Sequence, residues 1–208
     1  MNARHDPAPL DLPLPPESRD SRRRQVGEIE LRDAAVQQFN QLLAQIAPNA
    51  PRVSADQLVT LARWLQDQPR EHAVAILSER LARAEHLRRM LNDTDWDVCV
   101  DTRERARMLI SYLQQVDDLI PDTQPLLGQL DDALLVELAW PAFADETLDY
   151  RDFCRFRADE RPRGTPRERR LAWETACLAE VALLQQRRQV RARHYIGGEP
   201  LQALFRVG

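Results

Sequence analysis

Lysine is absent from this chain, and every one of its 29 basic residues is an arginine. Cysteine is scarce: three widely spaced residues, Cys99, Cys154 and Cys177, form no C-x-x-C pair. No apolar run approaches the ~20 residues that a membrane span needs, and proline interrupts the short apolar runs near the start. These absences argue against a zinc or redox centre, a disulfide-stapled domain and a membrane span. We therefore expect a cytoplasmic protein with reduced thiols.

The signatures of familiar enzyme classes are missing as well. The sequence contains no Ser-His-Asp or Cys-His arrangement, no glycine loop that would cradle phosphate and no dinucleotide fingerprint. Its four histidines are scattered, and His72 and His86 would lie roughly 21 Å apart on one helix, too far to share a metal ion. The residues therefore give no support for a particular catalytic reaction.

Charge is distributed unevenly along the chain. Residues 1–27 carry a net charge of +1, residues 28–160 carry −11 and residues 161–208 carry +6. This distribution and the composition predict three parts: a disordered Pro- and Arg-rich tail (1–27), an acidic helical body (28–160), and a basic long helix with a C-terminal tail that packs on the body (161–208). Opposite net charges favour pairing of the arm with the body of the same chain or of a second copy.

Apolar residues recur at helical spacing in every long segment, which predicts an all-α fold. We expect a bundle of roughly six to eight helices with a central buried helical hairpin. The first helix is predicted to begin at Glu28, and a clear amphipathic helix follows over residues 69–91. Residues suited to capping a helix, each followed three positions later by Gln or Glu, mark three helix starts. The predicted N-caps are Ser54, Asp101 and Thr165.

The most distinctive stretch runs from Tyr112 to Phe143. It contains five aspartates within sixteen positions, and no arginine occurs anywhere from Met108 to Tyr150. Pro121 and Gly128 interrupt the helical pattern, and an almost wholly apolar helix over residues 130–140 should lie at the centre of the core. The aspartates are Asp117, Asp118, Asp122, Asp131 and Asp132.

This stretch resembles the YkvA-like family of small bacterial proteins over about residues 105–143. The family motif is a helix ending in P-x-D-L-I-P-D, a link P-x-x-G, and a D-D pair that opens an apolar helix. Here the matching segments are 118–122 (DLIPD), 125–128 (PLLG) and 131–132 (DD), with Val116 in place of the first proline. The resemblance implies a helical hairpin, often found in membrane-associated chains, and no established catalytic activity.

A hairpin would bring four of these aspartates together: Asp118, Asp122, Asp131 and Asp132. Carboxylates at close range repel unless a cation or an arginine neutralises them. Oxygen ligands of this kind suit Mg²⁺, Ca²⁺ or Mn²⁺, so a divalent-metal site is one hypothesis. The alternative is that the aspartates cap helices and are balanced by arginine or solvent, since carboxylates are also favoured at helix starts.

The C-terminal helix ends in a basic cluster and carries an apolar face, the row Leu171, Leu178, Val181 and Leu184. Its candidate partner-binding residues are Arg187, Arg188, Arg191 and Arg193. Three functions follow from these features. The first is a non-enzymatic cytoplasmic scaffold or interaction protein. It would use the acidic motif face or the arm to bind a protein partner or a second copy of itself. The others are a divalent-metal-dependent hydrolase using the aspartates, and a nucleic-acid-binding regulator using the arginine-rich helix, for which the mixed charges give little support.

Overall fold

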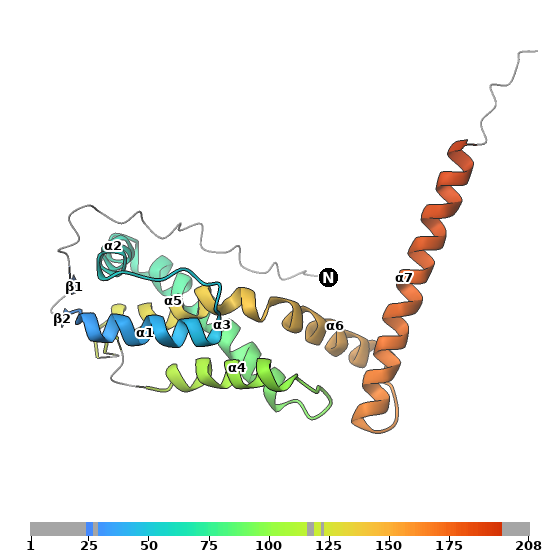
Figure 1. Cartoon of the computed structure of the whole chain (residues 1–208), viewed down its shortest axis with the longest axis horizontal. Helices are drawn as coiled ribbons and strands as arrows, with labels where there is room; N and C mark the ends of the chain where they lie inside the picture. The colour runs from blue at the N-terminus through green and yellow to red at the C-terminus, as the bar shows by residue number, and fades with distance from the viewer. Residues whose placement is uncertain (1–23, 27–28, 116–118, 122, 197–208) are drawn as a thin grey trace, which may run out of the picture. The chain divides into compact units, whose positions relative to one another are not determined.

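The computed structural model describes residues 24–26, 29–115, 119–121 and 123–196, with side chains as far as Val190. These residues form seven α-helices, two 3₁₀ turns and one pair of two-residue strands (Figure 1). The predicted all-α fold is confirmed. The chain divides into two compact units, Met1–Arg151 and Asp152–Gly208, and the boundary between them falls inside a helix. The predicted disordered tail lies outside the described residues except for positions 24–26.

The start of the first helix differs from the prediction. Strands β1 (Gln25–Val26) and β2 (Ile29–Glu30) pair antiparallel, and α1 begins only at Asp33 and runs to Ile46. The Leu31 N–H donates to the Arg24 carbonyl at 2.6 Å. A start at Glu28 was therefore wrong, because strand pairing uses the backbone groups that a helical turn would need.

Helices α2 (Ala55–Gln66) and α3 (Arg70–Asn92) follow. The predicted capping box is confirmed: Ser54 Oγ accepts from the Gln57 N–H at 3.3 Å, and Gln57 Oε1 accepts from the Ser54 N–H at 2.9 Å. The Asn40 side chain joins α1 to this corner, donating to the Val53 carbonyl at 2.7 Å and accepting from the Val53 N–H at 2.8 Å. The entry of α2 is thereby fixed against α1.

Helices α4 (Val100–Tyr112) and α5 (Leu130–Ala139) form the predicted central hairpin, with the 3₁₀ turn η1 (Leu127–Gln129) between them. α5 packs against α1, α3 and α4 (Figure 1). Its apolar side chains are almost all buried, which explains why this helix lacks a polar face. The N-cap of α4 is Cys99, whose Sγ accepts from the Thr102 N–H, so the predicted cap Asp101 was wrong and lies in the first turn instead.

The 3₁₀ turn η2 (Trp140–Ala142) leads into α6 (Ala144–Glu160). Two hydrogen bonds hold the start of α6 to the loop before α4: Trp96 Nε1 donates to Glu146 Oε1 at 2.8 Å, and Tyr150 Oη donates to Asp93 Oδ2 at 3.0 Å. Trp96 is buried among these contacts. Asp93 of this loop is therefore used within the fold.

The second unit contains the end of α6 and the long helix α7 (Pro166–Ile196). Its predicted start is confirmed: Glu168 Oε2 accepts from the Thr165 N–H at 2.7 Å, and Thr165 Oγ1 accepts from the Glu168 N–H at 3.3 Å. The backbone and hydroxyl bonds from Thr165 hold the pKa of Glu168 below its ordinary value. The capping box therefore stabilises the helix fully at pH values above the ordinary carboxyl pKa. This stabilisation is lost as the pH falls through the lowered pKa of Glu168.

None of the helices in the described parts of the chain is both long enough and apolar enough to cross a bilayer.

Replacing Ser54 by Ala should lower the free energy of unfolding by about 1 kcal/mol, because the Gln57 N–H loses its acceptor at the start of α2. Urea denaturation measures the change. Ser111→Ala is the matched control, since Ser111 is exposed inside α4 and caps nothing. Equal effects of the two substitutions would contradict the role assigned to the capping box.

Candidate functional site

The predicted metal ligands divide into two groups. Asp118 and Asp122 lie outside the described residues, while Asp131 and Asp132 lie in the first turn of α5 and are buried. Asp131 is 0% exposed, and its Oδ2 accepts from Tyr112 Oη at 2.8 Å and from the Ile120 N–H at 3.3 Å. Its carboxylate therefore ties the end of α4 and the segment around Ile120 to the start of α5.

Asp131 does not cap its own helix. The N-cap of α5 is Gln129, whose side chain makes no capping hydrogen bond; Asp131 and Asp132 lie in the first turn, where the helix dipole favours carboxylates, so neither is the N-cap. Tyr112 also packs edge-on against Phe39 of α1, with ring centroids 5.9 Å apart. The Tyr112–Asp131 contact thus joins α1, α4 and α5 at one buried point.

A metal site needs several ligands converging on one position. Among the residues whose placement is described, no group of three or more His, Cys, Asp or Glu side chains has that arrangement. The four-aspartate site involves Asp118 and Asp122 as well, and it stays a prediction.

Tyr112→Phe should destabilise the protein by about 1–3 kcal/mol, because it removes a donor from a fully buried carboxylate. Thermal or urea unfolding measures the loss. Tyr150→Phe makes the same chemical change where the acceptor, Asp93, is partly exposed and can bond to water, so its effect should be smaller. A larger loss for Tyr150→Phe would show that the Asp131 contact is not the dominant one.

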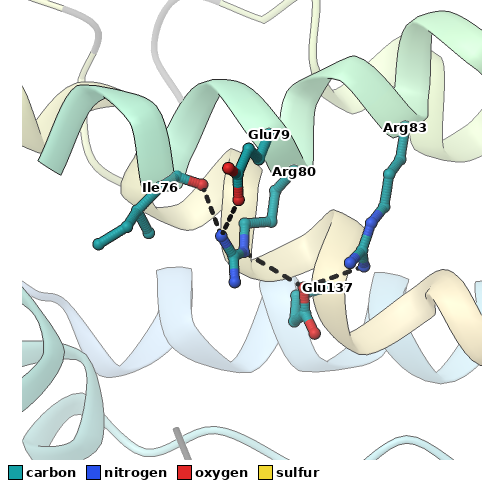
Figure 2. Close-up of polar contacts among 5 residues, drawn as sticks. All are labelled: Ile76, Glu79, Arg80, Arg83 and Glu137. Atoms are coloured by element: carbon teal, nitrogen blue, oxygen red, sulfur yellow. Dashed lines mark hydrogen bonds and ion pairs between the residues drawn. The ribbon is translucent and has the colours of Figure 1, made fainter. Parts of the chain in front are cut away.

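A second buried cluster joins α3 to α5 (Figure 2). Glu137 Oε2 lies 3.4 Å from Arg80 Nε and 3.0 Å from Arg83 Nη1. Arg80 Nη1 also donates to the Ile76 carbonyl at 3.0 Å and to Glu79 Oε2 at 3.3 Å. Burial lowers the pKa of Arg80, and Glu137 opposes that effect by favouring the charged guanidinium.

The sequence pattern did not predict the cluster of Arg80, Arg83 and Glu137. One signal pointed to it: Glu137 is the only charged residue in the apolar stretch 133–144, so its carboxylate needed a partner inside the core. The partners come from another helix, and the spacing of α3 alone does not single them out. Arg83 also stacks over Trp140, its guanidinium carbon 5.3 Å from the ring centroid.

A small apolar cavity lies beside this cluster, between α2, α3 and α5. Its volume is ≈ 50 Å³, and its lining includes Trp64, Leu134 and the edges of Arg80 and Glu137. Pockets for cofactors and metabolites usually measure roughly 300–1,000 Å³. This cavity has room for a few water molecules, and the ion cluster is therefore better explained as a core contact than as a ligand site.

Glu137→Gln should destabilise the fold by about 3–5 kcal/mol, because it leaves the buried Arg80 without its counter-charge. Glu79→Gln removes the other carboxylate that contacts Arg80, but Glu79 is 54% exposed, so we expect a loss of about 0–1 kcal/mol. Chemical denaturation of the two variants compares the same chemical change at a buried and an exposed site. Similar losses would contradict a dominant buried pair.

The second unit presents a different surface. The side chains of Arg187 and Arg188 are exposed, while those of Arg191 and Arg193 lie outside the described part of the structure, although both residues belong to α7. The α7 apolar row is also exposed, by 60% at Leu171, 72% at Leu178, 51% at Val181 and 47% at Leu184.

Among the described side chains of α7, those at its base pack against α6. Trp173 Nε1 donates to Asp152 Oδ2 of α6 at 2.9 Å, and the Trp173 ring meets Phe153 edge-on with centroids 6.0 Å apart. Cys177 Sγ lies 3.9 Å from the same carboxylate. From Leu178 to Val190 every side chain is exposed. Beyond its base, the described part of α7 therefore presents an exposed apolar surface.

Comparison with protein-family models, with curated proteins and with solved structures found no match for this chain.

Proposed function

We propose that this chain is a non-enzymatic helical scaffold or interaction protein that binds another protein through α7. The observation that carries the proposal is the exposed α7 apolar row. Between residues 171 and 184 the only polar residues are Glu174, Thr175 and Glu180. A helix segment that is apolar on nearly all sides is normally buried, and contiguous exposed apolar surface marks interaction sites.

The energy available at this surface is substantial. Fully burying a leucine or valine side chain contributes ~1.5–3 kcal/mol, and the row contains four such side chains. The surface ion pairs of the neighbouring arginines would add only ~0–1 kcal/mol each. Apolar burial therefore supplies the driving force, and the arginines select the partner and its orientation.

Two buried acids of α5 support the same proposal. The carboxylate of Asp131 is used inside the fold by Tyr112 and Ile120, and Glu137 is used by Arg80 and Arg83. These acids maintain the body rather than line an open catalytic cleft. The resemblance of residues 105–143 to the YkvA-like family is part of the proposal too, since it implies a helical hairpin without catalytic activity. The proposal also includes a cytoplasmic location.

A photoreactive benzophenone side chain at position 178, introduced into the full-length chain in its native cells, tests the proposal. We expect a defined protein cross-link from position 178, because Leu178 is the most exposed member of the row. Position 176 is the matched control: Ala176 is also exposed, and a shift of two residues turns the side chain by about 200° around the helix, to the opposite side. Mass spectrometry identifies the products.

Equal labelling from positions 176 and 178 would overturn the proposal. So would products at 178 that are sensitive to nuclease, which would favour the nucleic-acid regulator instead. A protein product specific to 178 supports an interaction function, whichever protein is captured.

A further inference from the structure

Charge is separated along α7 (Pro166–Ile196). Residues 166–181 contain three arginines and three glutamates and are neutral, whereas residues 182–196 contain four arginines and no acid, giving +4. The α7 apolar row lies in the first part and reaches into the second at Leu184. Any protein that covers the row must therefore also accept a neutral end and a strongly basic end.

From this pattern we infer that α7 binds a second copy of the same chain, with the two α7 helices antiparallel. The inference rests on the proposed function and names the partner. A twofold dimer requires a surface that is complementary to itself. α7 meets this condition in one orientation only, because a parallel pair would set the two +4 segments side by side, while an antiparallel pair sets each beside the neutral, glutamate-containing half of the other.

The spacing of the row also suits helix pairing. Leu171 and Leu178 are seven residues apart and Val181 follows three later, and the same heptad positions continue at Gln185 and Arg188. These are the seam positions of a two-helix coiled coil, which recur every three or four residues; the position between Leu171 and Leu178 is Glu174, so three of the six positions are apolar. The polar residues at Glu174, Gln185 and Arg188 leave only a short apolar seam, so we expect a modest affinity.

The best register places Leu178 of one copy opposite Val181 of the other. Arg188 then lies opposite Leu171 of the second copy, about three residues, or ~4.5 Å along the axis, from Glu174. Glu174 is half-exposed and already lies 3.2 Å from Arg170 on its own helix, so its carboxylate is held where a second guanidinium can reach it. Leu178 and Val181 pack at the centre, and Arg188 meets Glu174 of the other copy toward each end of the seam.

The first test measures association of the full-length chain. Sedimentation and light scattering at micromolar concentrations should give a mass that rises with concentration to twice the 24.0 kDa of one chain. Leu178→Arg should weaken dimerisation at least tenfold, because it puts two charges at the centre of the seam. Ala176→Arg adds the same charge on the opposite side of α7 and should leave the dimer intact. Both residues are exposed, and circular dichroism verifies that both variants fold.

The second test measures orientation. In a background where Cys99, Cys154 and Cys177 are serine, Leu171→Cys and Arg188→Cys chains of different mass are mixed and oxidised. An antiparallel pair gives the mixed disulfide, because like positions lie roughly 26 Å apart along the axis, far beyond the ~4.4–6.8 Å between Cα atoms that a disulfide spans. A parallel pair gives like-with-like disulfides.

The outcomes separate this inference from the proposed function. A chain that remains monomeric, with cross-links from position 178 to a different protein, overturns the self-pairing and leaves the interaction function standing. A monomer without any specific cross-link from 178 overturns both. Like-with-like disulfides overturn the antiparallel arrangement, and a dimer that Leu178→Arg does not weaken overturns the role of α7.

Discussion

The fold depends on a carboxylate placed where water cannot reach it. Asp131 is fully buried at the start of α5, and a buried charge is tolerated only where donors satisfy it. Those donors come from the part of the hairpin that precedes α5: the hydroxyl of Tyr112 at the end of α4, and the backbone N–H of Ile120 in the following segment. The position of the hairpin is thereby set by one polar group inside an apolar core.

The other end of α5 carries a second buried acid. Glu137 lies between Arg80 and Arg83 of α3, so α5 is anchored by charge at both ends and by leucine, valine and alanine packing between them. Apolar contacts alone tolerate small shifts of one helix along another, because most side chains find comparable neighbours. Two fixed polar contacts make such shifts costly, since each shift strands a buried charge.

The two units use their residues in opposite ways. In the first unit, the buried acids Asp131 and Glu137 make contacts between helices inside the core. In the second unit, the capping box of Thr165 and Glu168 begins α7, and the hydrogen bond from Trp173 to Asp152 holds its base against α6. The apolar residues of the α7 row are exposed. The surface proposed for interaction is therefore apolar and helical, while the buried acids Asp131 and Glu137 serve the fold.

The sequence by itself determined the local features. Helical periodicity predicted the all-α fold, the boxes at Ser54 and Thr165 marked two helix starts, and the apolar run 130–140 identified the central helix, because each depends on residues within one or two turns. Tertiary structure decided the rest. Strand pairing moved the start of α1, Cys99 replaced Asp101 as a cap, and Asp131 bonded to Tyr112 rather than to its own helix. Long-range partners of this kind are set by which helix faces meet in space, and no spacing along the chain encodes that choice.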